Sequence, residues 1–179
     1  FDAIKASFQT WEDDIGSFMA YTFMGTTTRN NQSDGYNVVS WLPIDGPDGT
    51  LAVTTYWYNP ITKEMTEFDI VFDADDTWSA TGELGKYDIQ NVGTHEVGHT
   101  LVLEDLYDAA DSEETMYGFS PKGETRKRTL DTGDIAGIRY IYPSPIPNLT
   151  VTVTVATNPS GRQIEIDGVT YIAPQSFNW

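Results

Sequence analysis

The sequence predicts an α+β fold, in which helical and extended stretches follow one another along 179 residues. Apolar residues make up 39% of the chain and aromatic residues 13%, which is enough for a packed core. An apolar stripe of helical period opens the chain, and stretches rich in aromatic and β-branched residues follow it. The length suits one main domain with a small appendage.

The chain is strongly acidic, with 27 acidic and 10 basic side chains and a net charge of −17. This charge argues against binding to nucleic acid or to an anionic membrane. It suits calcium, which prefers carboxylate oxygens, although solubility or adaptation to salt explains the acidity equally well. The absence of cysteine excludes disulfides and a thiol redox role. No apolar run is long enough for membrane insertion.

The first half of the chain is expected to contain one helix and several strands. Residues 2–15 have apolar side chains on one helical face, at Ile4, Phe8, Trp11 and Ile15, and Gly16 is a plausible stop. Four stretches rich in aromatic and β-branched residues are expected to be strands: 18–28, 36–42, 51–58 and 65–72. The connector at 59–64 suits a hairpin, and 73–87 is expected to be a loop.

The second half predicts two further helices and a separate tail. Asp88 can cap a helix that begins near Ile89, whose buried stripe is expected at Ile89, Gly93, Val97 and Leu101. After an irregular stretch, a last helix runs from Asp131 or Thr132 to about Tyr140. We expect a main domain over 1–142, a proline-rich linker over 143–149 and a β-strand tail over 150–179. About thirty residues cannot form much of a core alone, so the tail is either the start of a truncated β module or packs on the main domain.

Both histidines of the chain lie in one pentapeptide, His95-Glu96-Val97-Gly98-His99. Residues four apart share a face of a helix, so the two imidazoles can converge on one metal ion, for which zinc is the natural candidate. Glu96 is rotated by about 100° around the helix, toward a water on the metal. The alternative is a chance H-E-x-x-H string on a surface helix.

A third zinc ligand must be a carboxylate, because no other histidine exists, and Asp105 is the candidate. If the helix ends near Val102 and the chain turns back, Asp105 can reach the metal. If the helix continues, six residues rotate Asp105 by about 600° and it points away.

Three motifs in order resemble the metzincin zinc endopeptidases, and among them the matrixins of prokaryotic type. The family extends the motif to H-E-x-x-H-x-x-G-x-x-H, with Asp as the last residue in some members, and Asp105 falls at that position. Met116 and Tyr117 match its methionine turn in type and spacing. The run from Leu130 to Tyr142 closely follows its closing pattern, L-x-x-D-D-I-x-G-I-x-x-I-Y. The resemblance implies a zincin-like fold with a twisted, mostly parallel sheet, an active-site helix and a C-terminal helix.

The resemblance also implies a calcium site, and the chain departs from the family pattern at the glycine of the zinc motif. The glycine of the motif is Val102 here, and glycine takes a backbone conformation that costs a β-branched residue roughly 1–2 kcal/mol. The loops 45–49 and 73–76 look like the two parts of the family's calcium site, with Asp73, Asp76 and Asp45 as side-chain ligands. The alternative is a pair of solvated acidic loops.

The expected function is a zinc-dependent endopeptidase that hydrolyses extended protein or peptide substrates. Glu96 would be the general base on zinc-bound water, and residues 51–58 would pair with the substrate. The first alternative is a catalytically impaired surface or binding protein, in which Val102 misplaces Asp105. The second is a β-rich wall protein with an accidental motif. We expect a monomer that is extracellular or associated with the cell surface, with its signal and pro-region outside this chain. A weak resemblance of the tail to small β modules of prokaryotic surface proteins suggests a longer parent protein.

Overall fold

The structure is a computed structural model that describes residues 1–144, 152–166 and 168–178. The chain divides into two compact units, Phe1–Ser144 and Pro145–Trp179. In chain order the larger unit contains α1 (Asp2–Glu12), β1 (Val38–Leu42), β2 (Ala52–Tyr58), β3 (Met65–Asp73), β4 (Trp78–Ser79), β5 (Tyr87–Asp88), α2 (Ile89–Thr100), the 3₁₀ helices η1 (Ala109–Asp111) and η2 (Arg126–Arg128), and α3 (Thr132–Ile141).

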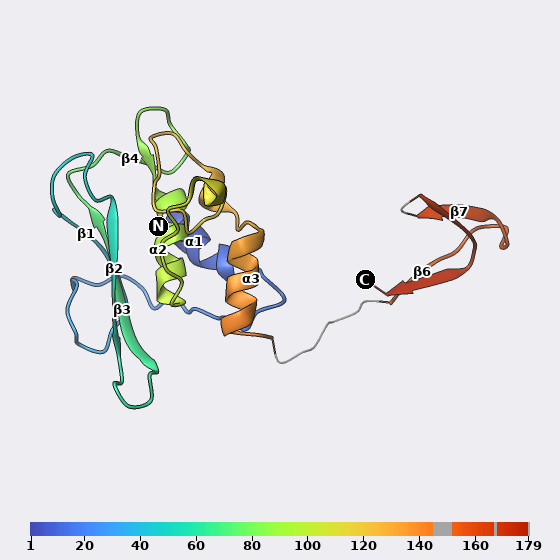
Figure 1. Ribbon diagram of the computed structural model, residues 1–179, viewed down its shortest axis with the longest axis horizontal. Coiled ribbons are helices and arrows are strands. Elements are labelled where there is room, and N and C mark those ends of the chain that lie inside the picture. Colours follow the sequence, from blue (N-terminus) through green and yellow to red (C-terminus); the bar gives the residue numbers. More distant parts are fainter. Residues whose placement is uncertain (145–151, 167, 179) are drawn as a thin grey trace. The chain divides into compact units, whose positions relative to one another are not determined.

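The main sheet of the larger unit has the strand order β1-β3-β2. The middle strand, β3, pairs in parallel with β1 and antiparallel with β2, so that the 59–64 connector closes the expected hairpin. Strands β4 and β5 form a separate parallel pair within the stretch that we expected to be a loop. Two of these three pairings are parallel, and the three α-helices lie on one side of the main sheet (Figure 1).

The core lies where α1 and α2 meet the inner face of the sheet. Trp11 and Phe72 are fully buried, and the indole Nε1 of Trp11 donates to the Thr94 carbonyl of α2 at 2.8 Å. Val97 and Leu101, from the expected stripe, belong to the same core cluster as Trp11 and Phe72. Because a buried tryptophan needs a partner for its N–H, this hydrogen bond sets how α1 lies against α2.

Helices α2 and α3 begin as the sequence predicts. The Asp88 carboxylate accepts from the main-chain N–H of Asn91 at 2.9 Å, which satisfies one of the free donors of the first turn of α2. Asp131 caps α3 in a capping box, whose second member is Asp134. The caps are confirmed, and they define the entry points of both helices.

Two expectations for the N-terminal region are wrong. The first helix ends at Glu12 rather than Ile15, and Ile15 is 85% exposed. Residues 18–28 form no strand, and Met24 is 90% exposed. Aromatic and β-branched composition favours a strand only where a ladder partner exists, and among the described residues β1 pairs with β3 alone.

In its described residues the smaller unit contains four strands: β6 (Thr152–Val155), β7 (Gln163–Ile166), β8 (Val169–Ile172) and β9 (Gln175–Asn178). They form two antiparallel pairs, β6 with β9 and β7 with β8. The first and second strands of the tail occur where the sequence predicts them. Most of the expected linker, residues 145–149, lies outside the described residues. Within the described ranges, no helix has the length and apolar character needed to cross a bilayer.

Candidate metal centre

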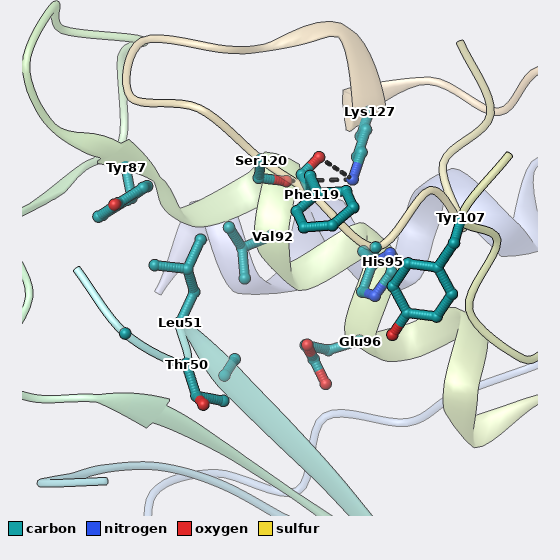
Figure 2. A pocket seen from close by; sticks show the side chains of 13 residues that line it. Thr50, Leu51, Tyr87, Val92, His95, Glu96, Tyr107, Phe119, Ser120 and Lys127 are labelled. Atoms are coloured by element: carbon teal, nitrogen blue, oxygen red, sulfur yellow. Dashed lines mark hydrogen bonds between the residues drawn. The ribbon is translucent and has the colours of Figure 1, made fainter. Parts of the chain in front are cut away.

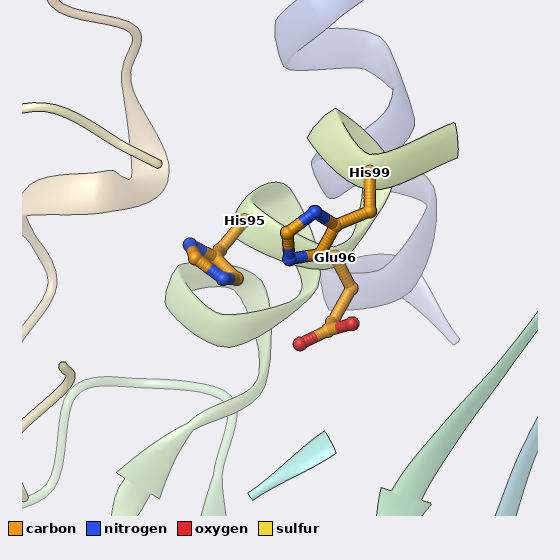
Figure 3. A group of neighbouring side chains, drawn as sticks. All are labelled: His95, Glu96 and His99. Atoms are coloured by element: carbon orange, nitrogen blue, oxygen red, sulfur yellow. The ribbon is translucent and has the colours of Figure 1, made fainter. Parts of the chain in front are cut away.

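Helix α2 carries the H-E-x-x-H motif, and the side chains of the motif are largely buried. His95 is 9% exposed and Glu96 is 5% exposed. The two imidazole rings lie 4.8 Å apart between centroids and at 90° to one another, with the Glu96 carboxylate beside them (Figure 3). One potential ligand atom from each of His95, Glu96 and His99 lies within 4.8 Å of the others.

Main-chain carbonyls hold both imidazoles in one orientation. The Nδ1 atom of His95 lies 2.8 Å from the Thr115 carbonyl oxygen, and Nδ1 of His99 lies 2.8 Å from the Leu103 carbonyl oxygen. A carbonyl oxygen only accepts, so each Nδ1 carries the proton. In the neutral form of each ring the lone pair is therefore at Nε2, which is the arrangement that a metal requires of histidine.

The chain turns back after α2, although the residue at the turn is valine. Val102 has φ 65°, in the left-handed region that favours glycine. The N–H of Val102 donates to the His99 carbonyl at 3.0 Å, and the N–H of Leu103 donates to the Gly98 carbonyl at 3.2 Å. These are the two hydrogen bonds of a Schellman motif, so the helix ends where the family motif places its glycine.

The turn at Val102 brings Asp105 to the imidazoles. Its Oδ1 lies 3.1 Å from His95 Nε2 and 3.7 Å from His99 Nε2. The hydrogen bond from His95 lowers the pKa of Asp105 to about 2, against the effect of partial burial. The donor set of two imidazole nitrogens and one carboxylate oxygen fits a divalent ion such as zinc, which would replace the proton shared between His95 and Asp105.

The expected methionine turn lies beneath the motif helix. Met116 is 2% exposed, and a Cβ on Gly98 would lie 2.2 Å from its Sδ, so α2 can approach this closely only with glycine there. The Asp134 carboxylate accepts from the N–H groups of Thr115 at 2.7 Å and Met116 at 3.2 Å. Asp134 thus ties the turn to the start of α3.

The carboxylate of Glu96 faces strand β2. The Thr54 hydroxyl lies 2.7 Å from Glu96 Oε2 and 3.0 Å from the Glu96 carbonyl oxygen. A hydroxyl proton donates best to the charged acceptor, so Thr54 orients the carboxylate. The sequence contained no signal for this contact, because the two residues lie 42 positions apart.

A cavity of about 400 Å³ adjoins His95 and Glu96 (Figure 2). Lys127 lies at its wall, is 1% exposed, and donates to the carbonyl oxygens of Tyr117 and Phe119 and to Ser120 Oγ. Burial lowers the pKa of Lys127 to about 8. The lining combines apolar, aromatic and polar residues: Gly49, Thr50, Leu51, Ala52, Tyr87, Val92, His95, Glu96, Tyr107, Gly118, Phe119, Ser120 and Lys127.

The three candidate calcium ligands lie in differing surroundings. The Asp73 carboxylate is fully buried and accepts hydrogen bonds from the N–H groups of Asp75, Ile44 and Asp45. The bond from the Asp75 N–H contributes most to holding the pKa of Asp73 below its ordinary value. Asp76 is 8% exposed, and its Oδ2 is buried without a hydrogen-bond partner. The Asp45 carboxylate binds Thr50 instead. The structure does not gather these three carboxylates into one compact cluster.

Two histidines on one helix, a carboxylate after a sharp turn and a methionine beneath them match the arrangement that the metzincin motifs of the sequence imply. The chain belongs to the matrixin family, whose family model matches residues 2–143. The family comprises zinc metalloendopeptidases of the metzincin class, which confirms the family and fold that the motifs predict.

Several known proteins are similar to this chain. It is 36% identical to metalloendoproteinase 1 of Glycine max in an alignment of 153 positions that covers 78% of this chain and 44% of that protein. It is 34% identical to human stromelysin-3 over 126 residues, which are 70% of this chain and 23% of that protein. Interstitial collagenase of Oryctolagus cuniculus is 31% identical over 159 residues, covering 84% of this chain and 30% of that protein. The chain thus spans less than half the length of these relatives.

Proposed function

We propose that this protein is a zinc-dependent endopeptidase in which His95, His99 and Asp105 hold the metal and Glu96 is the general base. The observation that carries the proposal is the convergence of His95 Nε2, His99 Nε2 and Asp105 Oδ1. Both Nδ1 atoms already donate to carbonyl oxygens, so the Nε2 lone pairs are left for a metal.

The protein residues would divide the reaction between them. Zinc in such a site acidifies water and polarises the carbonyl of the scissile bond. Glu96 would accept the proton of the attacking water and then deliver it to the leaving amine. Thr54 would keep the Glu96 carboxylate in the orientation that this transfer needs. Met116 and Asp134 would support the site from below without contacting the substrate.

The substrate would be a protein or peptide in extended conformation. Strand β2 is an edge strand of the main sheet, and one of its two edges pairs with β3. Its other edge offers main-chain donors and acceptors to an extended chain, which would lie over Glu96 beside the cavity. We propose a monomeric enzyme that acts outside the cell or at its surface, with residues 143–149 as a linker and 150–179 as a separate β-strand tail.

The turn at Val102 favours activity over the alternative of an impaired binding protein. In that alternative, valine at the glycine position prevents Asp105 from reaching the metal. Val102 instead takes the left-handed conformation, and Asp105 lies 3.1 Å from His95 Nε2. The strain of roughly 1–2 kcal/mol is small beside the binding energy of a structural zinc, about 10–16 kcal/mol.

The decisive experiment separates metal binding from catalysis. Elemental analysis should find one zinc per chain, and a quenched peptide or casein should be cleaved unless a chelator is present. Glu96→Ala should retain zinc and lose hydrolysis, whereas His95→Ala should lose both. Glu64→Ala, in the exposed connector after β2, is the matched control and should behave as the parent. Parental activity in Glu96→Ala would contradict the mechanism, and a parent that binds zinc without cleaving peptides would favour the impaired protein.

We also propose that calcium binds beside Asp73 and Asp76. The support is the buried, unpartnered Oδ2 of Asp76 together with the fully buried Asp73 carboxylate. An unsatisfied carboxylate oxygen in such a place is costly unless a cation completes it. Calcium should raise the melting temperature of the parent and of Glu104→Gln, an exposed acid, but not that of Asp76→Asn. An equal rise in all three proteins would contradict this site.

A further inference from the structure

We propose that Tyr107 is a positioning residue that holds the Asp105 carboxylate in place as a metal ligand; the inference rests on the proposed function. The Tyr107 hydroxyl donates to Asp105 Oδ2 at 3.0 Å, while Asp105 Oδ1 faces the two imidazoles. With Oδ2 engaged, the carboxylate presents a single oxygen to the metal.

Asp105 needs such a support more than the histidines do. Main-chain carbonyls at 2.8 Å fix each imidazole, and no substitution of a side chain can remove them. The Asp105 side chain is 34% exposed and can rotate toward water. The Tyr107 hydroxyl binds Oδ2 of Asp105, the carboxylate oxygen that is turned away from the metal. Hydrogen-bonding partners of this kind govern ligand orientation and metal affinity.

The backbone places Tyr107 where this bond can form. Leu106, between the two residues, accepts from the N–H of Gly118 at 2.9 Å and donates to the Met116 carbonyl at 2.8 Å. This bridge to the methionine turn keeps the segment extended, and side chains two apart in an extended segment lie on the same face. Asp105 and Tyr107 therefore project together toward the site.

The ring of Tyr107 is also held in place. It contacts Phe119 edge-on, with 5.8 Å between ring centroids, and lies across Gly118, where an added Cβ would come within 2.5 Å of it. Figure 2 shows the hydroxyl directed to the side of the site where His95 and Glu96 lie. Although Tyr107 is 63% exposed, its hydroxyl is thus directed to one place, and it lines the cavity as well.

The test is a double-mutant cycle on zinc affinity in the full chain, measured by competition with a chromogenic chelator. Tyr107→Phe removes only the hydroxyl and should weaken zinc binding by about 10–100-fold. In an Asp105→Ala background the same change should alter the affinity by less than about twofold, since the acceptor is gone. Tyr140→Phe, at an exposed position of α3, is the control and should bind zinc as the parent does.

The outcomes distinguish this inference from the proposed function. Parental zinc affinity in Tyr107→Phe would overturn the role of Tyr107 and leave the endopeptidase proposal intact. An equal loss of affinity with and without Asp105 would also overturn it, because the hydroxyl would then act elsewhere. A parent that binds no zinc would overturn both. The unfolding free energies of the zinc-free variants should equal that of the zinc-free parent. This measurement excludes a general loss of fold as the cause of weaker zinc binding.

Discussion

Val102 is the residue where this chain departs most sharply from the glycine that its backbone favours. It has φ 65° at the end of the helix that carries both histidines. We predict that Val102→Gly is more stable than Val102→Ala. Both substitutions remove the same 45% exposed side chain, so the loss of its packing cancels between them. Only the backbone preference of glycine and alanine then differs.

The size of the stability difference between the glycine and alanine variants follows from two opposing effects. A left-handed conformation costs an L-residue about 1–2 kcal/mol, and glycine avoids this cost. The greater freedom of glycine in the unfolded chain costs about 0.5–1 kcal/mol. Glycine should therefore be favoured over alanine by about 0.5–1 kcal/mol, which corresponds to a difference of about 1–4 °C in melting temperature for a chain of this size. At an ordinary position inside a helix, the alanine variant would instead be the more stable of the two.

Thermal and urea unfolding of the chelator-treated variants would measure this difference without a contribution from bound metal. Equal stability of the two variants, or greater stability of Val102→Ala, would refute the argument, because residue 102 would then lie outside the left-handed region. In that case the Schellman hydrogen bonds to the His99 and Gly98 carbonyls could not form as described. The route by which Asp105 reaches the imidazoles would then need another explanation.

Two further predictions follow from single contacts. Thr54→Val should lower kcat on a quenched peptide about tenfold, which corresponds to a rise of roughly 1.4 kcal/mol in the activation free energy, with little change in KM. Thr54→Ser keeps the hydroxyl and should retain the parental rate. Equal rates in both variants would contradict the role of the hydroxyl. Burial would raise the pKa of Asp88, but the hydrogen bonds from Arg128 and from the Asn91 N–H outweigh it and hold this pKa below its ordinary value. The ionised form therefore stabilises the fold near neutral pH, and the benefit is lost as pH falls through the folded pKa. The difference in unfolding free energy between the parent and Asp88→Asn, measured in urea, should therefore be larger at pH 6 than at pH 3; a constant difference would refute this linkage.

Local sequence patterns were sufficient for the elements whose structure depends on neighbours along the chain. Asp88 begins α2, and the i, i+4 spacing alone brings His95 and His99 to one face. The 59–64 connector joins two antiparallel strands as expected. The stretch 18–28 shows the limit of such patterns, because its composition favours a strand but no strand in the described part of the chain pairs with it.

By itself the sequence determined that two imidazoles and a carboxylate share one helical turn, since the period of a helix requires no information from elsewhere. It also supplied Asp105 as the candidate third donor, but left its direction open. Only the tertiary structure decided that direction, through the left-handed turn at Val102 and the bond from Tyr107. Thr54 likewise reaches Glu96 because β2 packs beside α2. Contacts between segments far apart in the chain depend on how the helix, strand and turn pack around a common core, and no local pattern encodes that packing.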